Sequence, residues 1–351
     1  METRFQAGHL LSERYQLLEY LAQGGMGEVW KAKDGILERV VAIKLLPQGM
    51  VDSNPTALAH LRDEAKANAQ LIGSPYIVTL LDFGMHMQGT EFIHYLVMEY
   101  VEGVSVETWI TEPSPAGTEP QLEYLLSLYI GWGLCEGLER AHTHGLIHRD
   151  IKPSNVFLDK NRGFIKLGDF GLARFIDAAT RPYTLARAGS PAYSSPEQWM
   201  GDKTSKKTDC YQLGCTLYHI FAKQLPFSGG IHEVVQGHIE ELPESIPHIP
   251  TELDRLLLGL MQKKPKDRFD IKEAKDQLAS FLMPYRYLHL SNLQMSSVLE
   301  FVHPFFSEVT PQQLQDNPII EYARWTDCLA VAMRLLLSGF SAFRVEATPQ
   351  A

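Results

Sequence analysis

The order of apolar and polar positions separates a strand-rich first part of the chain from a helix-rich remainder. Alternation typical of short strands occurs, between turn residues, at residues 15–21, 28–33 and 39–46. Two further apolar runs cover residues 77–83 and 92–98. Between these groups, residues 55–72 carry an apolar stripe at helical spacing, formed by Leu58, Leu61, Ala65, Ala69 and Ile72. This first part predicts a sheet with one main helix.

Helical periodicity dominates the chain after a loop-like segment at residues 111–120, which is rich in Pro, Gly and Thr. Apolar residues recur at helix spacing over residues 122–141 so densely that a buried helix is expected. Further helical patterns cover residues 209–223, 252–262 and 271–282. Strands followed by helices predict an α+β protein of two lobes with a site between them.

Residues 284–351 form a separate C-terminal extension. Pro311, Asn317-Pro318 and the apolar run at residues 319–343 predict two or three short helices. The stretch at residues 328–343 is too short for a confident membrane span and carries Arg334 near its centre. Packing on the larger lobe is favoured over a docking or dimerisation surface.

Composition restricts the function classes. The chain has 351 residues, a net charge of -10, 45% apolar and 21% charged residues. This balance disfavours nucleic-acid and anionic-membrane partners. The four cysteines form no CxxC pair, and the first residues do not resemble a secretory signal. A cytoplasmic protein with reduced, buried thiols and no membrane span is therefore expected.

The first candidate for chemistry is Gly24-Gly25-Met26-Gly27-Glu28-Val29, between two predicted strands. Glycines there let backbone amides approach phosphate oxygens. A simple glycine-containing hairpin turn explains the segment equally well. The segment is not a P-loop, because no Gly-Lys-Ser/Thr closes it and a strand follows.

Lys44 ends the apolar run Val41-Ala42-Ile43-Lys44 on the third predicted strand. A lysine in such a run is usually one polar-face residue of an alternating strand. On the face next to the glycine turn, its ammonium could hold phosphates. Such a lysine needs a carboxylate to position it, and the following helix offers Asp63 and Glu64.

The strongest local signal is the segment from His148 to Asn155, His-Arg-Asp-Ile-Lys-Pro-Ser-Asn. The carboxylate of Asp150 could accept a hydroxyl proton, Lys152 could neutralise a phosphoryl group, and Asn155 offers an amide oxygen to a hard cation. Downstream, Asp169 in Lys166-Leu167-Gly168-Asp169-Phe170-Gly171 adds a second oxygen ligand. Asp-Phe-Gly alone would be an ordinary turn, but together with Asn155 it favours a magnesium site.

These motifs, in this order, resemble the eukaryotic-like (Hanks-type) serine/threonine protein kinase family, and the glycine segment looks most like its bacterial branch. The resemblance covers roughly residues 14–283 and implies a bilobal kinase fold. It divides the chain into a lead (1–13), an N-lobe to about residue 98, a hinge (99–103) and a C-lobe (104–283). The helical extension (284–351) lies outside it.

The resemblance also implies roles for single residues. Asp150 would be the catalytic base, Lys152 the γ-phosphate partner, and Lys44 the α- and β-phosphate partner paired with Glu64. Asn155 and Asp169 would bind Mg²⁺, with Mn²⁺ as an alternative. Around ATP it places Leu21, Ala22, Gln23, Gly24, Gly25, Met26, Gly27, Glu28, Val29, Ala42, Met98 (the gatekeeper), Glu99 and Val101.

Other matches concern structure and regulation. Glu197 in Ser195-Pro196-Glu197 would pair with Arg268, and Asp209 would hold the catalytic-loop backbone. Lys152 and Ser190 resemble the pattern for serine and threonine acceptors. Arg149 would bind a phosphorylated activation segment, so autophosphorylation at Thr180 or Thr184 is expected to raise activity.

The expected partners are ATP and protein substrates, with self-association through the N-lobe or the extension as a further option. Ala22 departs from the family pattern, since it stands where the first glycine is usual. Two alternatives remain: a pseudokinase, disfavoured by the joint presence of Lys44, Asp150, Asn155 and Asp169, and a small-molecule or lipid kinase, disfavoured by the peptide-docking resemblance of residues 189–197.

Overall fold

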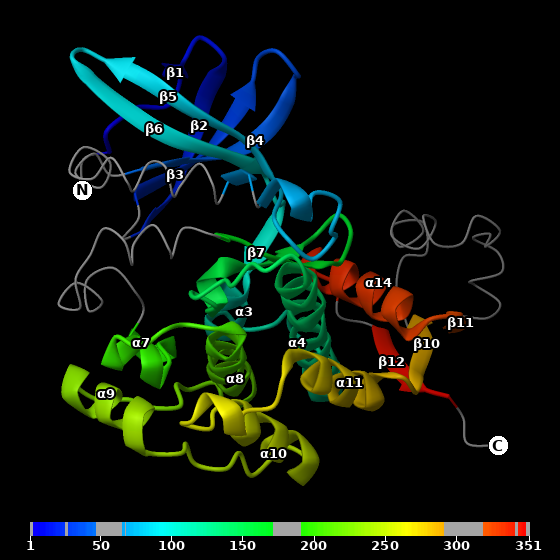
Figure 1. The fold of residues 1–351 in the computed structure, drawn as a ribbon. Coiled ribbons are helices and arrows are strands. Elements are labelled where there is room, and N and C mark those ends of the chain that lie inside the picture. The colour runs from blue at the N-terminus through cyan, green and yellow to red at the C-terminus, as the bar shows by residue number, and fades with distance from the viewer. Residues whose placement is uncertain are drawn as a thin grey trace.

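A computed structural model describes residues 3–24, 27–46, 65–66, 68–170, 191–290, 319–340 and 343–348. It shows a sheet-containing N-lobe above a mostly helical C-lobe, with the C-terminal extension on the side of the C-lobe (Figure 1). The α+β class and the two-lobed arrangement predicted from the sequence are confirmed.

The N-lobe is built on a six-stranded antiparallel sheet with the order β1-β2-β3-β4-β6-β5. Its strands are β1 (Leu10–Leu11), β2 (Tyr15–Gly24), β3 (Gly27–Asp34), β4 (Arg39–Leu45), β5 (Leu80–Gln88) and β6 (Glu91–Glu99). One face packs around Leu17, Trp30 and Ile43, which are all at most 2% exposed. Side chains alternate between the two faces of a sheet, and these three residues lie on the same face.

The predicted lead contributes β1, which pairs with β2, and Phe5 and Leu11 are buried in the N-lobe core. The main helix predicted at residues 55–72 lies largely outside the described residues. Its described end is the short 3₁₀ helix η1 (Ala69–Leu71).

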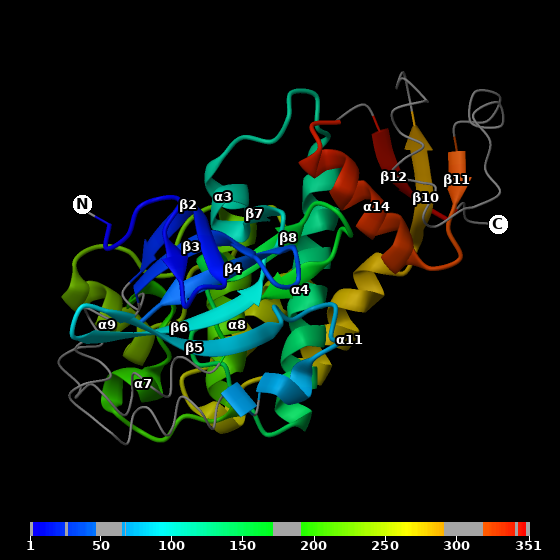
Figure 2. The same ribbon diagram turned by 90° about the horizontal axis from the view of Figure 1, so that it is seen from above.

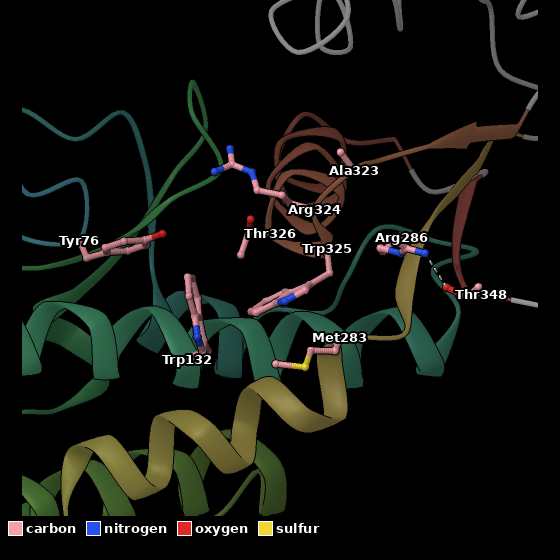
Figure 3. A pocket seen from close by; sticks show the side chains of 9 residues that line it. All are labelled: Tyr76, Trp132, Met283, Arg286, Ala323, Arg324, Trp325, Thr326 and Thr348. Atoms are coloured by element: carbon pink, nitrogen blue, oxygen red, sulfur yellow. Dashed lines mark hydrogen bonds between the residues drawn. The ribbon is translucent and has the colours of Figure 1, made fainter.

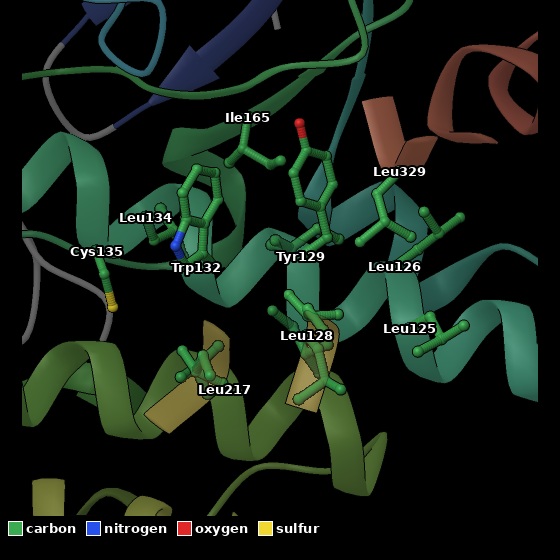
Figure 4. Close-up of a cluster of buried hydrophobic side chains, with 14 of the residues drawn as sticks. Leu125, Leu126, Leu128, Tyr129, Trp132, Leu134, Cys135, Ile165, Leu217 and Leu329 are labelled. Atoms are coloured by element: carbon green, nitrogen blue, oxygen red, sulfur yellow. The ribbon is translucent and has the colours of Figure 1, made fainter. Parts of the chain in front are cut away.

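The C-lobe is organised around α4 (Pro120–Thr143), the helix that the dense apolar periodicity predicted. Proline at its first turn suits the start of a helix, and Gly145, with φ +75°, follows its end. Side chains of α4 meet those of β9, α8 and α14 in one continuous core (Figure 4). The other helices are α3 (Val106–Thr111), α7 (Pro196–Met200), α8 (Lys206–Ala222), α9 (Ile231–Glu240), α10 (Thr251–Leu260) and α11 (Ile271–Leu282), with the 3₁₀ helices η2 (Pro153–Asn155), η4 (Pro191–Tyr193) and η5 (Pro265–Asp267).

Capping side chains set several helix starts. Ser205 and Thr208 form a capping box at α8, so this helix begins three residues before the predicted position 209. Asp270 and Glu273 do the same at α11, whose bounds match the prediction. Helices α3, α7 and α9 are short, and the sequence patterns did not predict them.

A second, three-stranded antiparallel sheet joins the hinge region to the catalytic loop. It has the order β7-β8-β9, formed by β7 (Gly103–Ser105), β8 (Val156–Asp159) and β9 (Ile165–Leu167). We call β8, β9 and the turn between them the catalytic ribbon. Asn155 directly precedes it and Asp169 follows it after one residue, so the ribbon connects two of the predicted site residues.

The C-terminal extension corrects one prediction. The described part of residues 284–351 contains β10 (Tyr285–Leu290), β11 (Ile319–Glu321), α14 (Trp325–Leu337) and β12 (Phe343–Ala347). The strands form an antiparallel sheet with the order β11-β10-β12, so the described part of the extension is mixed rather than wholly helical. The prediction was wrong because the pairing is non-local, and β10 joins strands far along the chain.

The extension packs on the larger lobe, as favoured from the sequence. Leu329, Leu335 and Leu336 of α14 are buried in the same core as α4. Figure 2 shows α14 beside α4, and Figure 4 shows Leu329 among the side chains of this core. Within the described residues, no helix combines the length and apolar character needed to cross a membrane. All four cysteines are buried and free.

Candidate active site

The glycine segment lies at the tip of the hairpin formed by β2 and β3. Gly24 pairs with Gly27, and Gly27 has φ +113°, which an L side chain rarely adopts. Gly25 and Met26 lie outside the described residues. Strand pairing places Ala22 opposite Val29 and Val29 opposite Lys44, so these three side chains share one face of the sheet.

Not every residue predicted around ATP has its side chain on this face. Gln23 pairs with Glu28, one position out of phase with Ala22 and Val29. Glu28 instead accepts hydrogen bonds from the backbone of Arg4 (2.8 Å) and from Nε1 of Trp30 (3.0 Å). Leu21, at the bulge of β2, is 39% exposed. The side chains of Gln23 and Glu28 are therefore separated from Lys44 by the sheet.

Lys44 on β4 shares its face with Ala42, two positions earlier, and with Met98 of β6, which pairs with Ala42. Val29, Ala42, Lys44 and Met98 thus form one continuous patch across three strands. Lys44 is only 4% exposed, and the structure gives it an acidic partner: Nζ lies 2.8 Å from Oδ2 of Asp169. The predicted partner Glu64 lies outside the described residues.

The hinge follows directly after Met98. The side chain of Glu99 forms an ion pair with Lys166 of β9, a contact that the sequence did not suggest. In the described part of the chain, the backbone groups of Val101 form no hydrogen bond with protein. A planar ligand whose edge faces the hinge could therefore form hydrogen bonds with the N–H and C=O groups of Val101.

The catalytic loop brings Asp150, Lys152 and Asn155 together. Nζ of Lys152 lies 2.8 Å from Oδ2 of Asp150. Nδ2 of Asn155 donates to the same Oδ2 (3.0 Å) and to the carbonyl oxygen of Asp150 (2.8 Å). Since both donor hydrogens of the amide are used, its Oδ1 atom is the group left for a cation.

Asp209 of α8 holds this loop from below. It is fully buried and accepts hydrogen bonds from the backbone N–H groups of His148 (2.9 Å) and Arg149 (2.8 Å). Arg149 has φ +68°, a strained value for a non-glycine residue that these bonds stabilise. The predicted role of Asp209 is confirmed.

Gln212 and Thr216, on the same helix, complete the support of the loop. Gln212 accepts from the N–H of Ile151 (3.0 Å) and donates to the carbonyl of Arg149 (2.8 Å). Thr216 donates to the carbonyl of Ile151 (3.3 Å). Sequence reasoning missed both residues, although they follow Asp209 by three and seven positions and so lie on the same helix face.

Asp169 joins the two halves of the site. The N–H of Gly168 donates to the carbonyl of Asn155 (2.8 Å), and Nε2 of His148 donates to the carbonyl of Gly168 (2.7 Å). Burial alone would raise the pKa of Asp169, but the charge and hydrogen bond of Lys44, together with the charges of His148 and Lys152, outweigh it, so its pKa lies below the usual value. Asp169 is therefore an anion at neutral pH, as a metal ligand must be.

The ion pair predicted between Glu197 and Arg268 in the C-lobe is also present. Arg268 contacts both carboxylate oxygens of Glu197, each at 2.8 Å, and Thr208 donates to Glu197 (2.8 Å). Burial would raise the pKa of Glu197, but Arg268 holds it below the usual value. Thr180, Thr184 and Ser190 of the predicted activation segment lie outside the described residues.

The donor set fits a hard divalent cation. Asn155 and Asp169 offer an amide oxygen and an anionic carboxylate from the two ends of one ribbon, and such oxygens are the ligands that Mg²⁺ prefers beside substrate phosphates. Lys44 adds a positive charge at the same place. The four residues that the sequence selected for this chemistry, Lys44, Asp150, Asn155 and Asp169, are thus brought together by the fold.

Comparison with known proteins agrees with this geometry. Residues 15–278 match the family model described as protein kinase domain. A probable serine/threonine-protein kinase of Clostridium perfringens, CPE1738, is 37% identical over 267 residues, which are 75% of this chain and 37% of that protein. The serine/threonine-protein kinase PknB of Mycolicibacterium smegmatis is 35% identical over 266 residues, 74% of this chain and 41% of that protein.

A solved structure shows the same fold. The crystal structure of the Mycobacterium tuberculosis PknI kinase domain superimposes with a TM-score of 0.59 at 24% identity, covering 79% of this chain and 99% of that domain. The chain spans less than half the length of the two curated relatives. Because the family model covers most of its residues, this chain belongs to the protein kinase family.

Proposed function

We propose that this chain transfers the γ-phosphoryl group of ATP to serine and threonine hydroxyls of proteins. The observation that supports this most is the linkage of two contacts: Lys44 with Asp169, and Asp150 with Asn155, joined by the hydrogen bond from Gly168 to Asn155. Phosphoryl transfer depends mostly on positioning and charge neutralisation. These four side chains, held by buried partners, provide both.

Nucleotide binding would use the patch on the sheet face and the hinge. Val29, Ala42 and Met98 offer apolar contacts to a base, and the backbone of Val101 offers a donor and an acceptor at its edge. Lys44 would hold phosphate oxygens. Mg²⁺, or Mn²⁺ in its place, would be held by Asn155 and Asp169 and would neutralise phosphate charge when bound.

The acceptor hydroxyl would lie against Asp150. Its carboxylate accepts or orients the hydroxyl proton, while Lys152, already 2.8 Å away, supplies positive charge for the phosphoryl group in transit. Asn155 and the backbone contacts of Asp209 fix the carboxylate in place. Lys152 at this position also supports serine and threonine, rather than tyrosine, as acceptors.

Autophosphorylation of the activation segment belongs to the same proposal. Arg149 would bind a phosphate on Thr180 or Thr184, because a phosphate adds about two negative charges that an arginine can pair with. If the double substitution Thr180→Ala and Thr184→Ala leaves turnover unchanged, this part of the proposal is wrong.

Labelled ATP tests the proposal. Wild-type protein should incorporate label into serine or threonine, and Asp150→Asn should lose most incorporation while still binding nucleotide, because the substitution keeps the shape of the side chain. Nucleotide binding without transfer by the wild type would indicate a pseudokinase. Equal incorporation by both proteins would indicate a contaminating kinase or another mechanism.

A further inference from the structure

The C-terminal extension touches the catalytic ribbon directly. Helix α14 lies beside α4 and over the turn that joins β8 and β9 (Figure 2). We propose that the extension is a positioning element of the catalytic centre, holding the ribbon whose two ends carry Asn155 and Asp169. This inference rests on the proposed function, since those two residues matter here as metal ligands.

The first contact is a close approach of backbones at Gly163. This glycine lies in the turn of the ribbon with φ +70°, and a Cβ placed on it would come within 2.0 Å of the carbonyl oxygen of Ala330 on α14. The absence of a side chain at Gly163 therefore lets the helix rest on the turn. A methyl group there would force the two apart.

A second link is electrostatic. Arg334 of α14 is only 8% exposed, and Asp159 at the end of β8 is only 6% exposed. Burial lowers the pKa of Arg334, and the negative charge of Asp159 opposes this shift. Asp159 also accepts from the backbone of Asn161 (2.9 Å) and Arg162 (3.1 Å), which fixes the turn.

The third contact runs through aromatic rings (Figure 3). Trp325, at the start of α14, packs against Trp132 of α4 with ring centroids 4.8 Å apart, and Trp132 packs against Tyr76 at 5.6 Å. The backbone of Tyr76 accepts a hydrogen bond from Leu167 (3.0 Å), the last residue of β9. The extension thus reaches both the turn and the far end of the ribbon.

These contacts matter for catalysis because the ribbon is short. Strands β8 and β9 pair over three residues, and the N–H of Gly168 donates to the carbonyl of Asn155 just beyond them. A displacement of the turn is therefore transmitted to both metal ligands. Groups that orient metal ligands change metal affinity when they are altered.

Gly163→Ala tests the inference, with Gly89→Ala as matched control. Gly89 has a similar φ of +63° in the turn between β5 and β6 but no atom within 4 Å of an added Cβ. The readout is the Mg²⁺ concentration that gives half-maximal binding of a fluorescent ATP analogue. We expect a rise of about tenfold for Gly163→Ala and no change for Gly89→Ala.

A milder pair of variants covers the case in which Gly163→Ala does not fold. Arg334→Met removes the buried charge but keeps the aliphatic stem, and Arg344→Met removes an arginine of β12 that is 48% exposed. Only Arg334→Met should raise the Mg²⁺ requirement. Wild-type Mg²⁺ dependence in folded Arg334→Met or Gly163→Ala, or an equal change in either control, overturns the inference.

Hydrogen exchange separates this inference from the proposed function. Residues 156–167 should exchange faster in Gly163→Ala than in wild type and Gly89→Ala, whether or not nucleotide binds. If wild type binds no ATP analogue, the proposed function fails while the exchange data still decide whether α14 holds the ribbon. Unchanged exchange in Gly163→Ala would contradict the positioning role.

Discussion

Nζ of Lys44 lies 2.8 Å from Oδ2 of Asp169, across 125 positions of sequence. This contact joins the N-lobe sheet to the end of the catalytic ribbon. It also helps to keep Asp169 ionised, since burial raises the pKa of that carboxyl group and Lys44 is the strongest of the neighbouring groups that lower it. One ion pair therefore joins the residue proposed to bind phosphate to a residue proposed to bind the metal.

Lys44→Met should remove this stabilisation. Without the lysine, the strongest contribution that opposes burial is lost and the pKa of Asp169 rises, so protonation competes with Mg²⁺ at a higher pH. We expect phosphoryl transfer to fall by about 100-fold or more, and the acid limb of Mg²⁺-dependent nucleotide binding to move to higher pH. An unchanged acid limb would show that Lys44 does not control Asp169.

Asp209→Asn tests the support of the catalytic loop. The N–H groups of His148 and Arg149 bind different oxygens of the carboxylate, Oδ2 and Oδ1, and in an amide one of these two atoms becomes an NH₂ donor that cannot accept. The loop should relax from the strained φ of Arg149, and turnover should fall by about 100-fold through misplacement of Asp150. Steady-state kinetics should show the loss in kcat rather than in KM for ATP. A loss confined to KM would contradict this role.

Much of the site could be predicted because its residues stand in short motifs whose chemistry is specific. Asp150, Lys152 and Asn155 occur within six positions, and strand alternation alone places Ala42 and Lys44 on one face. The ion pair of Lys166 with Glu99 could not be predicted in this way, because neither residue has a local signal for the other. Helix periodicity counted from Asp209 was enough to place Gln212 beneath the same loop, but Gln212 was not among the predicted residues.

The C-terminal extension, too, could be predicted only in part, because its strand pairing is not local. The apolar run at residues 319–343 was expected to form short helices and does contain α14, but β10, β11 and β12 pair over long sequence separations. The alternation in Tyr285–Leu290 was available as a strand signal. No sequence signal indicated the contact of Gly163 with α14, since a glycine in a turn has an ordinary local explanation.

The Glu197–Arg268 pair should matter more for stability than for chemistry. Its side chains are at most 5% exposed, so Arg268→Met leaves a buried carboxylate without its partner. The free energy of unfolding should fall by about 3 kcal/mol or more, measured by denaturant unfolding. Adding Glu197→Gln to that variant should recover part of the loss. A double variant less stable than the single one would show that the charge itself is not the cause.

His238 predicts a pH dependence of stability. It is fully buried beside Tyr211, whose hydroxyl lies 2.9 Å from its Nδ1, and burial, followed by the charge of Lys263, lowers its pKa from 6.5 to about 3. Between these values the unfolded chain binds a proton that the folded chain excludes. Stability should therefore fall as pH falls through this window, by up to about 1.4 kcal/mol per pH unit.

His238→Asn provides the comparison, because its side-chain oxygen can accept from Tyr211 but does not titrate. The variant should lose the part of the acid slope that His238 contributes. Midpoints of denaturant unfolding, measured for both proteins from pH 6.5 to 4, give the dependence of stability on pH. An equal dependence in both proteins would contradict its assignment to His238.

A crystal structure with a non-hydrolysable ATP analogue and Mn²⁺ tests the central claim most directly, since anomalous scattering locates the metal. We predict a Mn²⁺ peak coordinated by Oδ1 of Asn155 and the carboxylate of Asp169, with Lys44 on the α- and β-phosphates and Asp150 facing the γ-phosphate. Metal bound away from these two residues, or a nucleotide whose phosphates do not reach Lys44, would contradict it.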